Sequence, residues 1–382
     1  MRSPTRKSFL WTVICFTVEM IIIYLAALLR EHRFLYGGAA IGIVYLLVSL
    51  LSLKQKRKRM EHPGGDGNGN KRNRRKSRKR TLRGFTRIVL CLLPVLGTVK
   101  LCGLVGAAFL IPGRGDSVDS ISVEVTAKNA AVMSADTGAL LYQKNGTDRI
   151  APASTAKMIT ALTVLDVCSP DDGMTVGEEI RLMREDSSRA WLNRGDMLTV
   201  RQLLIALLLP SGNDAAYTLA ANAGREIAGD RHLTNEQSID VFMDRVNEKA
   251  RALGLENSHF SVPDGYDTEG QYTTACDLAV IAKACLESPC ISEIVANNRS
   301  YQKWVSGREV TYNNSNELLN PNSPYYRPEV IGIKTGNSSQ AGACVVSAAV
   351  IDGKTYISVV MGSGKAARFQ DSITIYDKIK AR

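Results

Sequence analysis

The chain has 382 residues, of which 45% are hydrophobic and 22% are charged. This composition excludes a wholly disordered protein and leaves room for one or two domains. The net charge of +11 is unevenly distributed, because residues 1–111 carry 21 Lys and Arg against 4 Asp and Glu, whereas residues 112–382 carry 27 against 33. The globular part is therefore acidic, which argues against a domain that binds nucleic acid.

Three long apolar segments precede the globular part. Phe9–Leu29, Phe34–Leu53 and Ile88–Ile111 contain 21, 20 and 24 residues, and each holds at most one charged side chain. Because about 20 apolar residues cross a bilayer as a helix, we predict that residues 1–111 form a membrane region with three transmembrane helices. A buried core helix is the alternative, and it is strongest for the third segment, which contains Pro94 and three glycines.

The segment between the second and third apolar stretches sets the orientation. Residues 54–87 carry 15 Lys and Arg against 2 acids, and such a short basic loop stays in the cytoplasm. We therefore expect a multi-pass protein of the cell membrane, in which residues 112–121 form a linker and residues 122–382 form one extracytoplasmic domain. A cleaved signal peptide is the alternative for the first segment, but a second apolar segment follows almost at once and no small-residue cleavage site separates them.

The outer domain has strand patterns at both ends and helix patterns in the middle. The turn Asp136-Thr137-Gly138 separates two short strands, Ala130–Ala135 and Ala139–Gln143, which we expect to form a hairpin. This order predicts one α/β domain, with a sheet that unites the two ends and a second lobe made of the central helices. The remaining helices are expected over Pro152–Asp166, Val200–Leu209, Asp214–Ile227, Ser238–Leu253, Thr274–Leu286 and Ala367–Ile379, and the remaining strands over Gly332–Gly336, Cys344–Ile351 and Lys354–Met361.

The cysteines and histidines give no sign of a metal site. The five outer cysteines are an odd number, so they cannot form a complete disulfide framework. Cys285 and Cys290 are close enough in sequence to pair, but their spacing with Cys276 does not fit a zinc site. His232 and His259 are the outer histidines and lie in unrelated contexts, so a Ser-His-Asp triad or a zinc peptidase lacks support. We expect neither a metal nor a cofactor.

Ser154 and Lys157 lie three residues apart in a predicted helix, where such residues share one face. A serine hydroxyl is a poor nucleophile until a base takes its proton. A lysine can be that base only when burial or a second cation destabilises its ammonium form. The pair therefore suits acyl transfer, although an ordinary surface serine and lysine is the alternative when this motif is taken alone.

Two further motifs follow along the chain. Ser211-Gly212-Asn213 lies between two apolar helices, where the alternative role of these residues is to stop one helix and cap the next. Lys334-Thr335-Gly336 follows an apolar run, and a lysine in an apolar strand needs a reason. This lysine either protects an edge strand by its charge or, together with the threonine hydroxyl, holds a substrate carboxylate.

These three motifs, in this order, resemble the boxes of the serine-type D-Ala-D-Ala carboxypeptidases, the low-molecular-mass penicillin-binding proteins. The likeness extends to Pro263-Asp264-Gly265 and Tyr272–Ala275, and it covers about residues 122–382. It implies a penicillin-binding transpeptidase-like α/β fold, in which an antiparallel sheet with flanking helices is joined to a helical lobe. In this chain, N-terminal transmembrane helices are expected to precede that domain.

The resemblance also implies a role for each motif residue. Ser154 would be the acylated nucleophile and Lys157 its general base, and the oxyanion hole would be formed by the backbone N–H groups of Ser154 and Asn337. Lys334 would share the cleft with Lys157, which we expect to lose its proton first because burial adds to the repulsion. Arg368 is a further candidate to hold the carboxylate. The implied catalytic residues are Ser154, Lys157 and Ser211, and the implied substrate-binding residues are Asn213, Lys334, Thr335, Gly336 and Asn337.

The resemblance implies a membrane-anchored serine carboxypeptidase that removes the terminal D-alanine from peptidoglycan stem peptides through an acyl-enzyme on Ser154. β-Lactam inhibitors are expected to acylate the same serine. One alternative is a β-lactamase, which is disfavoured by Gly212, where its signature has Asp, and by Arg189 at the Glu position of its Glu-x-x-Leu-Asn box. The other is a penicillin-binding sensor or scaffold that acylates without turnover and would keep all three motifs.

Overall fold

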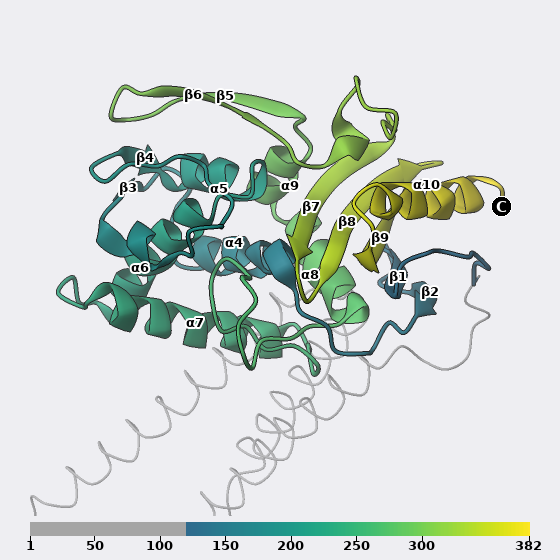
Figure 1. The fold of residues 1–382 in the computed structure, drawn as a ribbon, viewed down its shortest axis with the longest axis horizontal. Helices are drawn as coiled ribbons and strands as arrows, with labels where there is room; N and C mark the ends of the chain where they lie inside the picture. The colour runs from purple at the N-terminus through teal and green to yellow at the C-terminus, as the bar shows by residue number, and fades with distance from the viewer. Residues whose placement is uncertain (1–119) are drawn as a thin grey trace, which may run out of the picture. The chain divides into compact units, whose positions relative to one another are not determined.

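The computed structural model describes residues 120–382, in which a five-stranded antiparallel sheet joins the two ends (Figure 1). In spatial order, its strands are β2 (Leu140–Lys144), β1 (Asn129–Ser134), β9 (Lys354–Ser363), β8 (Gly342–Ile351) and β7 (Val330–Ser338). All four pairings are antiparallel, and β1 pairs with both β2 and β9. The first and last strands of the described chain therefore lie together in one sheet, as the order of elements in the sequence predicts.

The predicted transmembrane helices, the basic loop and most of the linker lie outside the described residues. Within residues 120–382, no helix is both long enough and apolar enough to cross a bilayer. The membrane region and the domain boundaries therefore stay predictions that rest on hydrophobicity and charge in the sequence.

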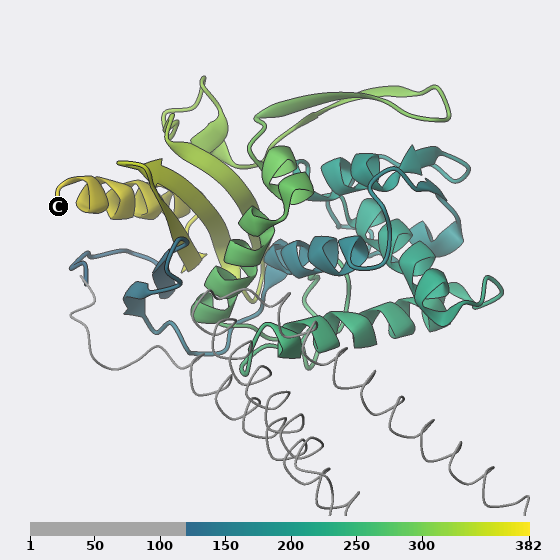
Figure 2. The ribbon, with the colours of Figure 1, turned by 180° about the vertical axis from the view of Figure 1, so that it is seen from behind.

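Helices cover both faces of the sheet (Figures 1 and 2). One face packs on α10 (Ala367–Lys380), which contacts β8 and β9, and the other packs on α8 (Ala275–Glu287), which contacts β1 and β9. Because successive strand residues point to opposite faces, adjacent residues of one strand contribute to two different cores. Ala130 in β1 belongs to the core beneath α10, whereas Ala131 belongs to the core beneath α8. Burial on both faces explains why these strands are almost continuously apolar.

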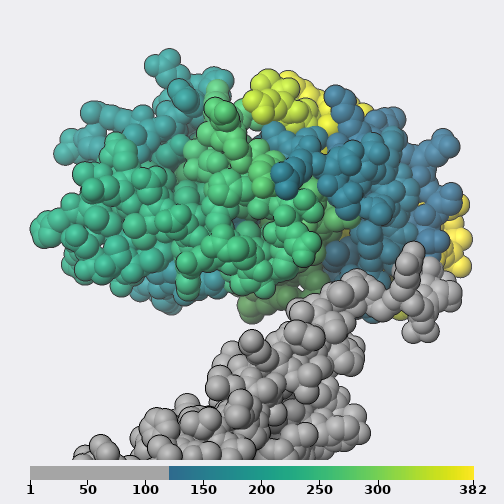
Figure 3. Space-filling view, turned by 90° about the horizontal axis from the view of Figure 1, so that it is seen from below, coloured from purple at the N-terminus to yellow at the C-terminus, as the bar shows by residue number. Residues whose placement is uncertain are grey.

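The second lobe is helical and is built around one central helix. Its helices are α4 (Lys157–Leu165), α5 (Val200–Leu208), α6 (Asn213–Ala228), α7 (Asn235–Ala252) and α9 (Pro289–Val295). α4 contacts α5, α6, α7 and α8, and every one of its residues except Leu165 is buried. In Figure 3 this lobe, in teal and green, lies opposite the blue and yellow ends of the described chain. The Ser154 turn at the start of α4 therefore lies where the lobe meets the sheet.

The expected helices and strands are present within a few residues of their predicted ends, with three differences. The predicted helix Pro152–Asp166 begins as a 3-10 turn, η1 (Ala153–Ala156), before α4 starts. The short helix α9 and two small hairpins were not predicted. These hairpins are formed by β3 (Gly173–Thr175) with β4 (Met197–Thr199), and by β5 (Arg299–Lys303) with β6 (Glu309–Asn313). The β3 and β4 strands have only three residues each, which is too short for a clear alternation.

Candidate active site

Ser154 lies on η1, and the backbone before it is held in an unusual conformation. Ala153 has a φ of +47°, in the region that favours glycine. Its carbonyl faces Gly265, which has a φ of +78°, and a Cβ atom at position 265 would lie 1.9 Å from Ala153 O. Only glycine fits there. The loop that contains Gly265 therefore packs directly against the turn that carries Ser154.

Lys157 is the most enclosed group of the site. Its side chain is 0% exposed, and its Nζ lies 2.8 Å from Ser154 Oγ, 2.7 Å from Asn213 Oδ1 and 2.8 Å from the backbone oxygen of Asp264. Burial lowers the pKa of Lys157 to about 8, against the opposing negative charges of Asp264 and Asp214. The predicted contact between Ser154 and Lys157 is thus present, and the amine is poised to lose its proton near neutral pH.

Lys334 occupies β7, the edge strand nearest to η1, yet its side chain is only 1% exposed. It is therefore not a solvent-facing charge that protects the edge. Burial lowers its pKa well below the usual range, and the charges of Lys157 and Arg368 add to that effect. Burial alone therefore does not distinguish the two amines in the way that the sequence led us to expect, because both are buried.

The second motif bends sharply into α6. Ser211 has a φ of +66°, and its buried Oγ has no hydrogen-bond partner among the described residues. Asn213 begins α6, and its Oδ1 accepts from Lys157 Nζ at 2.7 Å and from Ser188 Oγ at 3.2 Å. The N-cap of α6 is Gly212, and no side chain caps it. The capping role considered for Asn213 is therefore wrong, because its side-chain oxygen accepts a hydrogen bond from Lys157 instead.

Gly212 is required by space rather than by backbone conformation. A Cβ atom there would lie 2.6 Å from Ala190 Cβ and 2.7 Å from Asp214 Oδ1. The Asp214 carboxylate accepts the backbone N–H groups of Ala190 and Leu192, at 2.9 and 3.0 Å, and so holds that loop over the N-terminus of α6. An aspartate at position 212, as in the β-lactamase signature, has no room in this arrangement.

The third motif runs alongside η1. A Cβ atom on Gly336 would lie 3.2 Å from Ala153 Cβ and 3.4 Å from Ser154 N, so strand and turn are in contact. Thr335 Oγ1 shares a 2.6 Å hydrogen bond with Ser315 Oγ, and Asn337 is exposed. The structure therefore brings the strand that carries Lys334 against the turn that carries Ser154.

Arg368, a further candidate to hold a substrate carboxylate, hydrogen-bonds to the backbone of the third motif. Its Nη1 donates to the backbone oxygens of Gly336, at 2.9 Å, and Cys344, at 3.2 Å. The guanidinium thereby ties β7 to β8 behind the third motif. These hydrogen bonds stabilise β7 next to the third motif.

Asp264 and Asp267 belong to the site but were not identified from the sequence. Asp264 is 1% exposed, and its Oδ2 accepts Asn213 Nδ2 at 2.5 Å. Asp267 accepts from Ser338 Oγ at 2.7 Å and from Gln340 N at 3.0 Å, which ties the same loop to the end of β7. The segment Pro263-Asp264-Gly265, which resembles the family, was the one feature that pointed to Asp264, because the surrounding sequence has no periodic pattern.

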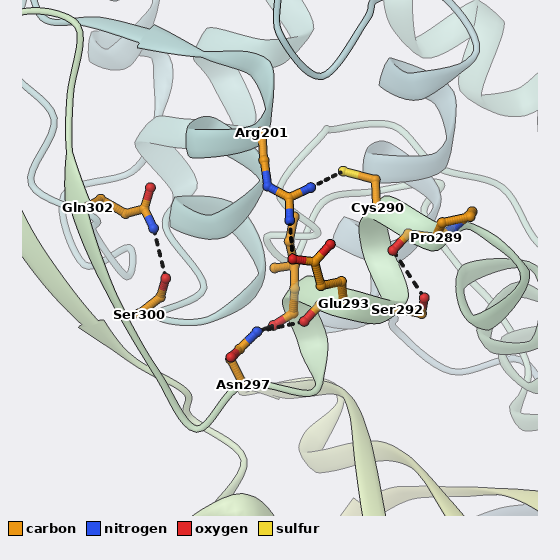
Figure 4. A network of polar contacts seen from close by, with 9 residues as sticks. Arg201, Pro289, Cys290, Ser292, Glu293, Asn297, Ser300 and Gln302 are labelled. Carbon is orange, nitrogen blue, oxygen red and sulfur yellow. Dashed lines mark hydrogen bonds and ion pairs between the residues drawn. The ribbon is translucent and has the colours of Figure 1, made fainter.

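A separate hollow lies between α5, α9 and β5 (Figure 4). Its polar side chains pair with one another: Arg201 Nη2 contacts Glu293 at 2.5 Å and Gln302 Nε2 donates to Ser300 Oγ at 2.8 Å. Arg201 Nη1 also donates to Cys290 Sγ at 3.7 Å. All five described cysteines are free thiols, so the disulfide considered for Cys290 is not formed. No motif residue lines this hollow.

Comparison with known proteins agrees with the motifs. A family model described as D-alanyl-D-alanine carboxypeptidase matches residues 116–365. The chain is similar to a D-alanyl-D-alanine carboxypeptidase of Bacillus subtilis, with 31% identity over 242 residues, and the match covers 62% of this chain and 57% of that relative. The chain thus spans less than two thirds of the length of the Bacillus protein.

Two crystal structures are similar to the described fold. A Streptomyces DD-transpeptidase matches with a TM-score of 0.62 and 32% identity, over 68% of this chain and 98% of that one. A D-alanyl-D-alanine carboxypeptidase from Mycobacterium tuberculosis matches with a TM-score of 0.59 and 29% identity, over 69% and 94% of the two chains. The penicillin-binding transpeptidase-like fold that the motifs predict is therefore confirmed.

Proposed function

Because the chain belongs to the D-alanyl-D-alanine carboxypeptidase family, we propose that it removes the terminal D-alanine from peptidoglycan stem peptides. The observation that carries this proposal is the 2.8 Å contact between Lys157 Nζ and Ser154 Oγ at a fully buried amine. Burial lowers the pKa of that amine to about 8, so a useful fraction is neutral near pH 7. A neutral amine at this distance can take the serine proton.

The proposed reaction has two steps. Ser154 Oγ attacks the carbonyl carbon of the penultimate D-alanine while its proton passes to Lys157, and the backbone N–H groups of Ser154 and Asn337 stabilise the oxyanion. The C–N bond then breaks, the departing D-alanine takes a proton relayed through Ser211, and an ester to Ser154 remains. Water hydrolyses that ester, which returns the serine hydroxyl and releases the shortened peptide.

The terminal carboxylate of the substrate is assigned to Lys334 and Thr335. Burial and the neighbouring cations destabilise the charged form of Lys334 and lower its pKa. An incoming carboxylate reverses this balance, because an opposite charge nearby favours the ammonium form. Recognition of a free carboxylate next to the scissile bond would confine cleavage to the last peptide bond of the substrate. Asn213 and Gly336 would line the same channel.

The cellular setting is proposed from the sequence. Three apolar segments before residue 112 would anchor the domain, and the basic loop 54–87 would stay inside. The domain would then face the cell wall, where its substrate lies. Protease added to intact protoplasts should digest the domain and spare the loop, and the reverse pattern would contradict this orientation.

The experiment that tests the activity uses the full-length protein in detergent. Incubation with a stem pentapeptide should release D-alanine and a tetrapeptide, identified by mass spectrometry, and Ser154→Ala should release neither. The structural match to a DD-transpeptidase makes transfer to an amine the second candidate. An added amine acceptor should then divert most of the product into a new peptide bond. A stable acyl-enzyme without turnover would indicate the sensor instead.

A further inference from the structure

The orientation of the Asn213 amide decides whether Lys157 can act as a base. A neutral lysine has two N–H donors and one lone pair, whereas the ammonium form has three donors and no lone pair. Lys157 Nζ has three neighbours, Ser154 Oγ, Asn213 Oδ1 and Asp264 O. Asn213 Oδ1 and Asp264 O can only accept hydrogen bonds. When the neutral amine donates one N–H group to each of them, its lone pair points toward Ser154 Oγ. A reversed amide would offer N–H groups to Lys157 and compete for that lone pair.

We propose that the Asp264 carboxylate is a positioning residue that fixes the Asn213 amide and thereby aims the Lys157 lone pair at Ser154, an inference that rests on the proposed function. A carboxylate only accepts hydrogen bonds, and Asp264 Oδ2 lies 2.5 Å from Asn213 Nδ2. The amide nitrogen is therefore held toward Asp264 and the amide oxygen toward Lys157. Ser188 Oγ donates to Ser211 O at 2.5 Å and lies 3.2 Å from the same amide oxygen.

The charge of Asp264 has a second, separable effect on Lys157. A carboxylate close to an ammonium group stabilises the ammonium form, so it opposes the effect of burial on the pKa of Lys157. Asp214, on α6, acts in the same direction. Lys334, from β7, is the neighbouring cation, and burial and the charge of Lys157 lower its own pKa. Burial and, after it, the charge of Asp264 raise the pKa of Tyr217, which keeps that phenol neutral. Removing the Asp264 charge alone should thus make Lys157 a weaker base that deprotonates at lower pH.

A purely structural role for Asp264 makes a different prediction. Its Oδ1 also accepts the backbone N–H of Tyr266 at 3.0 Å, which closes a turn two residues long. Asparagine forms the same kind of turn as aspartate. If Asp264 only held this turn, Asp264→Asn would keep both the turn and the pH dependence of the enzyme.

The test compares three variants of the full-length protein in detergent. Asp264→Asn keeps an acceptor for Asn213 but removes the charge, and Asp264→Leu removes both at similar volume. Asp371→Asn is the matched control, because Asp371 is also buried and accepts backbone N–H groups, from Thr126 and Ala127, on the far side of the sheet. The acylation rate by a chromogenic β-lactam is measured from pH 5 to 10, and thermal melting reports folding.

We expect the acid limb of the rate profile to move to lower pH in Asp264→Asn, by about one unit, the lower end of the effect of one nearby charge. Asp264→Leu should lose roughly 10- to 100-fold of the plateau rate, as expected when a catalytic group is misplaced by about 1 Å. Asp371→Asn should keep the wild-type profile. An unshifted limb in Asp264→Asn overturns the inference even if Asp264→Leu does not fold, because it would mean that Asp264 carries no charge and is not restricted to accepting hydrogen bonds. A wild-type plateau rate in folded Asp264→Leu would overturn it as well. Failure of the wild-type protein to be acylated would instead refute the proposed function.

Discussion

Gly265 and Ala153 are in direct backbone contact, although they are separated by more than one hundred residues in the sequence. A Cβ atom at position 265 would lie 1.9 Å from Ala153 O, and Gly265 has a φ of +78°. Ala153 directly precedes Ser154, the proposed nucleophile, so the loop around Gly265 sets the position of Ser154.

Gly265→Ala should therefore lower both stability and acylation. The left-handed backbone and the clash together predict a loss of roughly 2–5 kcal/mol in the free energy of unfolding. Gly270→Ala is the matched control, since Gly270 has the same φ of +78° but only Ser261 Oγ, at 3.9 Å, within reach of a Cβ atom. It should cost roughly 1–2 kcal/mol, the conformational penalty alone, and leave acylation unchanged. Equal effects of the two variants in urea unfolding and penicillin labelling would argue against the contact.

The two lysines should respond differently to arginine. Lys157→Arg introduces a group that cannot deprotonate in a protein, so acylation should fall by the 10²- to 10⁴-fold that is roughly typical of a lost general base. Lys334→Arg keeps a cation for the carboxylate with altered geometry, and measurable acylation should persist with weaker substrate capture. Stopped-flow acylation by a chromogenic β-lactam measures both. Similar rates in the two variants would show that Lys157 is not the base.

Acylation by the wild-type protein should rise with pH. The base must be neutral, and burial lowers the pKa of Lys157 to about 8. The neutral fraction therefore grows as pH rises, and the rate should increase about tenfold per unit below pH 7 and level off above pH 9. A rate that is flat between pH 6 and pH 9 would mean that Lys157 does not control the reaction.

Gly212→Asp should not create a β-lactamase. A side chain at this position meets Ala190 and Asp214, so the loop that Asp214 holds must move, and overpacking of this kind costs roughly 1–3 kcal/mol. Gly173→Asp is the control, because nothing lies within 4 Å of a Cβ atom there. We expect lower thermal stability and slower acylation in Gly212→Asp only. Faster hydrolysis of β-lactams by this variant would contradict the packing argument.

The sequence predicted the parts of the fold and site that leave a local pattern. The sheet strands are apolar and bounded by turns, and α4 to α8 and α10 have clear apolar periods, so their ends were placed within a few residues. The spacing of Ser154 and Lys157 also predicted their contact. Even the 3-10 turn at Ser154 preserves this spacing, since residues three apart lie on one side of either kind of helix.

The remaining features arise from contacts between distant segments. Lys157 hydrogen-bonds to the backbone oxygen of Asp264, which lies 107 residues further along the chain, and no local pattern near either residue predicts that contact. The same is true of the hydrogen bonds from Arg368 to backbone oxygens of β7 and β8. The sequence led us to expect burial to distinguish Lys157 from Lys334, but the burial of Lys334 also arises from contacts between distant segments.

The most direct test of the account is the position of the acyl group. The full-length protein would be incubated with labelled penicillin, digested, and mapped by mass spectrometry. We predict one modified residue, Ser154, with no label in Ser154→Ala at unchanged thermal stability. Label on Ser211, or label that persists in Ser154→Ala, would contradict the assignment of Ser154 as the nucleophile and Lys157 as its base.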